Sequence, residues 1–122
     1  MIQFIRLDHI LLPIPEGKTM EARAFYSQIL NLTEIPGEHP GGAIWFEIAG
    51  IQLHLREESG GSLSLRHPAF EVSNLAGARQ ELEQKGVTIS YSSDIEGRQR
   101  FFFRDPFGNR IELLEFVDEP NV

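Results

Sequence analysis

Hydrophobic residues in the first half of the chain follow first the period of a strand and then that of a helix. Residues 6–14 predict a strand, with His9 and Leu11 on one side and Pro13 near its end. Residues 20–30 predict a helix. Its apolar side consists of Ala22, Phe25, Tyr26 and Ile29. Further strands are predicted over residues 43–48 and 51–56, and a weaker one over residues 33–35.

The second half repeats this order of elements after a polar linker, residues 57–62. A strand is predicted over residues 67–72, and a helix begins at Ser73 or Asn74 and stops at Gly86. Three strands follow, over residues 87–91, 99–104 and 110–116. Each half is thus a βαβββ module, about residues 4–57 and 64–117, and residues 1–122 form one domain. The fold class predicted is α+β.

A shift of 58 residues places several informative positions of the two halves on one another. His9 falls on His67, His54 on Glu112, and Trp45 on Phe103. The spacing within each pair is the same, since 54 − 9 = 45 and 112 − 67 = 45. If a pseudo-two-fold axis relates the halves, these ligand-type side chains converge near that axis.

The strand period also sets the faces of the two ligand-type residues near the end of each half. His54 lies between Leu53 and Leu55, and Glu112 lies between Ile111 and Leu113. The aliphatic neighbours suit the side of the sheet under the helix, so His54 and Glu112 point to its open side. A lone strand His is most simply structural and a lone Glu most simply solvated. Four such residues at matched positions raise a metal site as a hypothesis, which the pattern alone does not favour.

Composition narrows the chemistry of such a site. Because the 122 residues include no cysteine, any metal is held by His nitrogen and carboxylate oxygen. The net charge of −7 arises without a basic run, so nucleic acid is not an expected partner. We find neither a signal-peptide pattern nor a membrane-length apolar run, and we expect a cytoplasmic protein with no membrane partner.

Several motifs resemble the vicinal oxygen chelate superfamily, which includes glyoxalases, fosfomycin-resistance enzymes, bleomycin-resistance proteins and extradiol dioxygenases. The motifs are Leu7-Asp8-His9-Ile10, Phe25-Tyr26 before Leu30-Asn31-Leu32, Leu53-His54-Leu55, His67-Pro68-Ala69-Phe70 and Asp105-Pro106-Phe107-Gly108-Asn109-Arg110-Ile111-Glu112-Leu113. The resemblance covers about residues 6–116. It implies two modules forming an open, curved mixed sheet around a metal and ligand cleft, with the helices outside.

The resemblance also implies a function. The metal ligands would be His9, His54, His67 and Glu112, with Glu112 also the catalytic base. A glyoxalase-like enzyme of lyase or isomerase type would stabilise an enediolate or alkoxide of a small substrate that chelates the metal through vicinal oxygens. The metal is divalent: Zn, Ni, Mn, Co or Fe. The family also implies a homodimer.

Two alternatives stay open at the level of sequence. His9, His67 and Glu112 match the facial triad of an Fe(II) extradiol-type dioxygenase, with His54 as a further acid or base. A metal-free drug-binding protein of the bleomycin-resistance type is the other. Fosfomycin is disfavoured, because Leu11 and Phe102 replace the Thr and Tyr of the fosfomycin-resistance enzymes. Four arginines could hold an anionic substrate, although a solvated position is the simpler interpretation of each: Arg56, Arg98, Arg100 and Arg104. His39 is most simply a surface residue.

Overall fold

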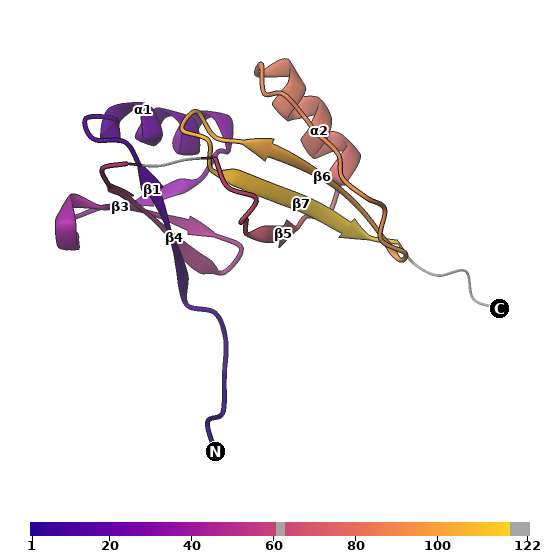
Figure 1. The fold of residues 1–122 in the computed structure, drawn as a ribbon, viewed down its shortest axis with the longest axis horizontal. Helices are drawn as coiled ribbons and strands as arrows, with labels where there is room; N and C mark the ends of the chain where they lie inside the picture. The colour runs from indigo at the N-terminus through magenta and orange to yellow at the C-terminus, as the bar shows by residue number, and fades with distance from the viewer. Residues whose placement is uncertain (61–62, 118–122) are drawn as a thin grey trace. The chain divides into compact units, whose positions relative to one another are not determined.

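The computed structural model describes residues 1–60 and 63–117. The chain divides near residue 61 into two compact units, called here the first and the second unit (Figure 1). The first unit is a four-stranded sheet, in the order β1-β4-β3-β2, with one helix. Its elements are β1 His9–Ile14, α1 Thr19–Ala24, the π-helical turn Phe25–Ile29, β2 Thr33–Ile35, the 3-10 turn Pro40–Gly42, β3 Ile44–Ile48 and β4 Ile51–Glu57.

The core of the first unit lies between the helix and the sheet. Strand β1 is parallel to β4, and β3 is antiparallel to β4. Tyr26 from the helical segment and Phe46 from β3 have no exposed surface, and their rings lie 5.9 Å apart. Leu53 and Leu55 of β4 are buried on the same side of the sheet. Burying such large apolar side chains contributes roughly 1.5–3 kcal/mol each, which fixes the helix on this face.

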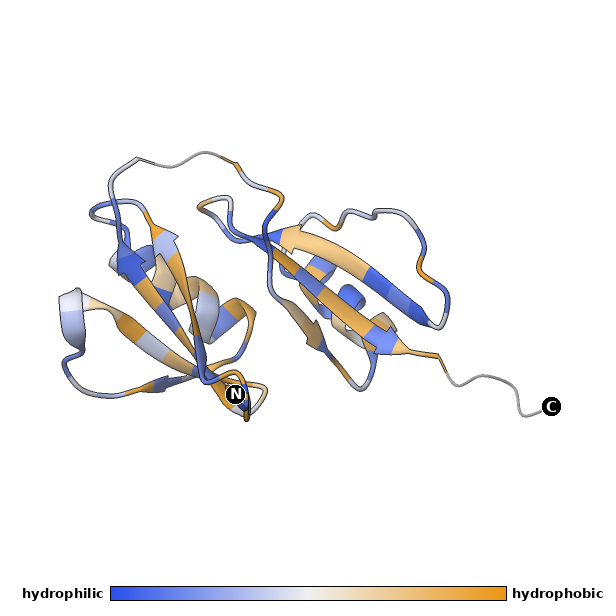
Figure 2. Cartoon of the chain, turned by 60° about the horizontal axis from the view of Figure 1, so that its bottom comes forward, coloured by the Kyte–Doolittle hydropathy of each residue, from blue (hydrophilic) through white to orange (hydrophobic). Residues whose placement is uncertain are grey.

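The second unit has the same plan in a shorter form. Its elements are β5 Ala69–Glu71, α2 Leu75–Gln84, β6 Arg98–Arg104 and β7 Arg110–Phe116, in the sheet order β5-β7-β6. The Asn74 side chain caps α2 by accepting a hydrogen bond from the Gly77 amide at 3.0 Å. Strand β6 runs from a hydrophilic start to a hydrophobic second half (Figure 2). Phe101 and Phe103 are buried on the helix side of this strand.

The α+β fold class is thus confirmed, with one helix packed on one sheet in each unit. The pseudo-two-fold arrangement and the single-domain boundaries stay predictions. Among the described residues, no helix is long and apolar enough to cross a membrane.

Three predicted strands differ from those observed. Strand β1 begins at His9 rather than Arg6, because its partner β4 is preceded by the turn at Ala49-Gly50 and the last bond is Gln52 N–H to Asp8 O. Strand β5 begins after Pro68, which has no N–H to donate, so His67 precedes the strand. The strand predicted over residues 87–91 is wrong: Ser90 alone forms a bridge, to Phe102.

The helix of the first unit also differs in detail from the regular helix predicted over residues 20–30. The α-helical bonds give way to a π-helical turn at Phe25, and the Leu30 amide donates to the Phe25 carbonyl at 3.2 Å. Asn31 ends the helical segment in the left-handed conformation with φ 58°.

The internal repeat is visible in strand pairing. Leu11 pairs with His54, and Ala69 pairs with Glu112, so the shift of 58 residues holds for the parallel strands. The same shift is wrong by one residue for the antiparallel pairs, β3 with β4 and β6 with β7. Trp45 pairs with His54, whereas Glu112 pairs with Phe102 and not with Phe103. The turn between β6 and β7 is longer than the one between β3 and β4, and the extra length changes the register.

Candidate metal centre

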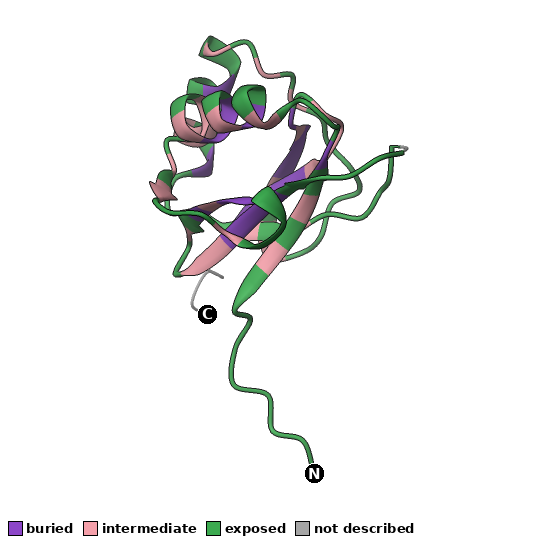
Figure 3. Cartoon of the chain, turned by 90° about the vertical axis from the view of Figure 1, so that its left-hand side faces the viewer, coloured by how far each residue is buried: buried purple, intermediate pink, exposed green. Residues whose placement is uncertain are grey.

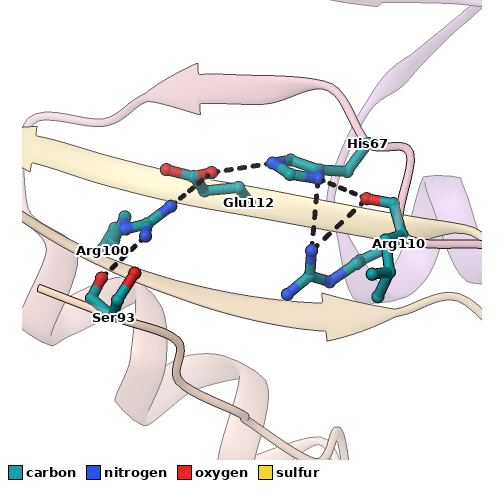
Figure 4. A network of polar contacts seen from close by, with 6 residues as sticks. His67, Ser93, Arg100, Arg110 and Glu112 are labelled. Atoms are coloured by element: carbon teal, nitrogen blue, oxygen red, sulfur yellow. Dashed lines mark hydrogen bonds and ion pairs between the residues drawn. The ribbon is translucent and has the colours of Figure 1, made fainter.

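The second unit brings His67 and Glu112 into direct contact. His67 Nε2 lies 2.9 Å from Glu112 Oε1, and the Glu112 side chain is 5% exposed. Figure 4 shows this pair with Arg100 on the Glu112 side and Arg110 on the His67 side. Strand β7 positions Glu112, and the short segment before β5 positions His67. The sequence pairing of these two residues therefore corresponds to a real contact.

Hydrogen bonding defines the tautomer of His67. Nδ1 lies 2.8 Å from the Leu65 carbonyl oxygen, which can only accept, so Nδ1 carries a proton. In the neutral imidazole, Nε2 then presents a lone pair toward the carboxylate oxygen of Glu112. Two acceptors at 2.9 Å repel one another unless a proton or another cation lies between them. The contact is therefore one in which His67 and Glu112 share a proton or a metal ion.

Arg100 is the other polar neighbour of the Glu112 carboxylate. Its Nη1 donates to Glu112 Oε1 at 3.3 Å, and its Nη2 donates to the Ser93 carbonyl at 2.7 Å. The same carboxylate oxygen therefore contacts both His67 and Arg100. Neither of these two contacts involves the other carboxylate oxygen, Glu112 Oε2.

The first unit brings His9 and His54 together in a stack of rings. The His9 and His54 ring centroids are 4.3 Å apart, and His54 also stacks on Trp45 at 4.0 Å. His39 covers the other face of Trp45 at 3.9 Å. Strand β3 supplies Trp45, β4 supplies His54 and the end of β1 supplies His9. The four rings thus hold the two predicted ligands in fixed orientations.

The hydrogen bonds of His9 and His54 leave one nitrogen of each ring with a lone pair. His9 Nδ1 donates to Asp8 Oδ2 at 2.9 Å, and this hydrogen bond lowers the pKa of the Asp8 carboxyl. His54 Nε2 donates to Gln52 Oε1 at 2.9 Å. His9 Nε2 and His54 Nδ1 therefore keep the lone pairs that a metal requires, and the carboxylate behind His9 is a common support of metal-bound imidazole.

Burial and neighbouring charge favour the neutral form of His54. Burial is the main cause that lowers the pKa of this imidazole, and positive charge on His9 and His39 lowers it further, against an opposing effect of Asp8. A neutral ring is the form that ligates metal. His54 is thus prepared for coordination at a pH where an exposed histidine begins to protonate.

The structure groups the four predicted ligands into two pairs, one in each unit. Within residues 1–60 and 63–117, no three His, Asp or Glu side chains are grouped so as to hold a metal ion. The assignment of His9, His54, His67 and Glu112 as a ligand set stays a prediction. Sequence reasoning missed the ring stack that includes His39 and Trp45, and it missed Arg110 beside His67. The one-residue change of register hid the equivalence of Trp45 and Phe102.

Comparison with known families assigns the chain to a superfamily. The family model for the Glyoxalase/Bleomycin resistance protein/Dioxygenase superfamily matches residues 6–113. The chain belongs to this superfamily. A putative glyoxalase family protein from Bacillus anthracis is 34% identical, with a TM-score of 0.86, over 96% of this chain and 100% of that one. No curated protein matches the sequence.

Other superfamily structures share the fold at lower identity. The fosfomycin resistance protein FosX from Listeria monocytogenes, in a mutant complex with Mn(II) and 1S,2S-dihydroxypropylphosphonic acid, is 20% identical with a TM-score of 0.79. It covers 94% of this chain and 95% of its own. An integron cassette protein from V. cholerae is 24% identical with a TM-score of 0.71, covering 96% and 99%. These likenesses show the superfamily fold alone.

Proposed function

We propose that this protein is a divalent-metal-dependent, glyoxalase-like enzyme of the cytoplasm that acts as a homodimer on a small substrate with vicinal oxygens. The proposed metal ligands are His9, His54, His67 and Glu112. One observation carries the proposal: His67 Nε2 lies 2.9 Å from Glu112 Oε1, a spacing at which an imidazole nitrogen and a carboxylate oxygen can share a proton or a metal ion. Superfamily membership and the Mn(II) complex of FosX add support.

The donor set fits such an ion. Imidazole nitrogen and carboxylate oxygen suit Zn, Ni, Mn, Co or Fe, and each histidine of the set is oriented by a bond from its other nitrogen. When bound, the ion supplies Lewis-acid stabilisation of negative charge developing on a substrate oxygen.

Two side chains near His67 have further proposed roles, Glu112 as a base and Phe102 as a packing residue. Glu112 Oε1 is oriented by Arg100 and His67, which leaves Oε2 to accept a proton from the substrate as general base. Phe102 packs edge-on against His67 with centroids 5.1 Å apart, and it is 2% exposed. It excludes water from the side of the imidazole that it covers and limits rotation of the ring.

Metal content tests the ligand assignment. Untagged wild-type protein, after chelation and reloading with Zn, Ni, Mn and Fe(II), is expected to hold near-stoichiometric metal by mass spectrometry. His67→Ala and Glu112→Gln should both abolish this content, because the first removes a ligand atom and the second replaces the charged carboxylate by a neutral amide. His39→Ala is the matched control, since His39 stacks on Trp45 and lies outside the proposed set.

The outcomes separate the functional classes. Metal lost in both variants and retained in His39→Ala supports the enzyme, and 2-oxoaldehyde thiol adducts are then the first substrates to assay, with catechols next. Wild-type protein that takes up no metal under any loading contradicts the proposal. Far-UV circular dichroism of each variant shows whether lost metal reflects lost folding, because Glu112 is buried.

A further inference from the structure

Strands β6 and β7 concentrate positive charge on the face that carries Glu112. The register pairs Arg98 with Phe116, Arg100 with Leu114, Phe102 with Glu112 and Arg104 with Arg110, so these residues share one face of the sheet. Four guanidinium groups therefore accompany Glu112 and the exposed Glu71 of β5 on this face. The whole chain carries a net charge of −7, so this concentration of arginine opposes the overall balance. Arg104 and Arg110 are directly opposite, an arrangement that destabilises a sheet by itself.

Two of these arginines flank the His67–Glu112 pair on a shared aromatic platform. The Cζ atom of Arg110 lies 3.8 Å from the Phe102 ring centroid, and that of Arg100 lies 5.1 Å from it. Arg104 is different, because its Nη1 donates to the carbonyls of Gly108 at 2.6 Å and Ser64 at 3.1 Å. Arg104 therefore holds the β6–β7 turn, whereas Arg100 and Arg110 face the proposed metal ligands.

The hydrogen-bonding capacity of Arg100 and Arg110 is only partly used. Within the described part of the chain, Arg110 Nη1 contacts the Leu65 carbonyl and His67 Nδ1, both at 3.4 Å. Nδ1 carries a proton, so the Leu65 carbonyl is the acceptor of the two and the bond is long. Among the same residues, the buried Nε of Arg100 has no hydrogen-bond partner. Each guanidinium has five N–H donors, and most of them remain for a ligand.

The charges around Glu112 add up to an excess of positive charge. Glu112 contributes one negative charge beside two guanidinium groups, those of Arg100 and Arg110, and beside the cation proposed to lie between its carboxylate and His67. A divalent ion would raise the positive excess further. An anionic group on the substrate is the simplest way to neutralise it, and guanidinium groups bind carboxylates and phosphoryl groups through paired, charge-assisted hydrogen bonds.

We propose that the substrate carries, besides its metal-chelating oxygens, a separate carboxylate or phosphoryl group that Arg110 and Arg100 bind beside Phe102. This proposal rests on the proposed function, since it places the anion next to the metal ligands. Arg110 is the specificity-determining residue, because it does not contact Glu112. Arg100 has two roles, since it binds the anion and also orients Glu112.

Matched pairs of hydroxy acids test the proposal by calorimetry on Mn-loaded protein. Malate adds a second carboxylate to the chelating group of lactate, and 3-phosphoglycerate adds a phosphoryl group to that of glycerate. In at least one pair, the member with the extra anion should bind about tenfold more tightly, as one charge-assisted contact allows. The pair that shows this preference identifies the anionic group.

Substitutions assign that preference to particular residues. Arg110→Gln should reduce the ratio of affinities within the pair to about one while metal content is retained. Arg79→Gln is the matched control: it removes the same charge from α2, where Arg79 pairs with Glu83 and Tyr91. Equal binding within both pairs by wild-type protein would overturn the proposal, and so would an Arg110→Gln variant with an unchanged ratio.

Failure of the proposed function gives a different result. If wild-type protein takes up no metal, the enzyme proposal fails, and the arginine pair is tested alone with inorganic phosphate and metal-free protein. Phosphate binding that Arg110→Gln weakens about tenfold and Arg79→Gln leaves unchanged would keep the anion site without the metal. If the metal-free protein also binds no phosphate, the proposed anion site is overturned together with the proposed enzyme.

Discussion

Trp45 lies between the imidazole rings of His39 and His54, with centroids 3.9 and 4.0 Å away. It is the single tryptophan of the chain, so its fluorescence reports on this position alone. A paramagnetic ion bound to His54 would be close enough to quench the indole. Quenching of Trp45 emission therefore reports an ion bound at the ring stack, and its loss in a His54 variant that still holds metal assigns coordination to His54.

We expect Co(II) to quench the emission of wild-type protein strongly as the metal site fills, and diamagnetic Zn(II) at equal occupancy to quench it much less. His54→Gln should keep the Trp45 emission in the presence of Co(II), because the ion is then no longer held against the stack. Near-stoichiometric Co(II) with unquenched wild-type emission would contradict coordination by His54 and leave it as a support for the His9 ring.

Some residues of the two clusters are predictable from the sequence and others are not. The spacing of 45 residues that the two halves share marks His67 and Glu112 as one pair, and the structure brings their side chains to 2.9 Å. The loop of His39 shows no periodicity, so the sequence predicts a surface position for this residue and no ring contact. The 3-10 turn Pro40–Gly42 brings this loop against β3, and the resulting stack on Trp45 depends on contacts that no local pattern encodes.

At the scale of elements, a side-chain hydrogen bond joins the start of α1 to the end of β4. Thr19 Oγ1 donates to Glu57 Oε2 at 2.7 Å. This hydrogen bond, with a second one from the Gly17 backbone, lowers the pKa of Glu57 below its ordinary value of 4.5. The stabilisation is therefore complete above the ordinary value and is lost as the pH falls through the lowered pKa.

Thr19→Val should consequently lower the urea midpoint more at neutral pH than at an acid pH below the lowered pKa of Glu57, because protonation of this carboxyl removes the charge that the hydroxyl group stabilises. Unfolding followed by circular dichroism at the two pH values measures the difference. Thr88→Val, at an exposed position outside the helices and strands, is the control and should change neither midpoint. An equal loss of stability for Thr19→Val at both pH values would show that packing rather than the carboxylate contact is responsible.

The ends of a strand depend on the length of the strand that pairs with it, which the sequence of the strand itself does not show. Residues 110–116 were predicted as a strand with the observed bounds, because β7 is the central strand of its sheet and pairs on both sides. The predicted strand over residues 87–91 fails, because the chain leaves the sheet after Ser90 and Ser93 instead uses its carbonyl to hold Arg100. Strand propensity cannot indicate where the partner ends.

At the scale of the whole molecule, the N-terminal segment before β1 is exposed to solvent (Figure 3). Large hydrophobic residues at least 59% exposed in this segment are Met1, Ile2, Phe4, Ile5 and Leu7. A segment of this composition is unfavourable in water and suits a protein interface. The proposed homodimer offers a second copy of the chain to cover it.

Sedimentation of wild-type protein should therefore give a mass near twice 13.9 kDa, and Phe4→Ser combined with Ile5→Ser should shift it toward the monomer. The reason is the loss of buried apolar area, at roughly 25 cal/mol per Å², from an interface that these side chains would form. Neither residue lies in a strand or is buried, so the fold of the first unit should be kept. Met20→Ser, 73% exposed on α1, is the matched control and should leave the mass unchanged. A wild-type monomer at every concentration, or a double variant that stays dimeric, would exclude this segment as the dimer contact.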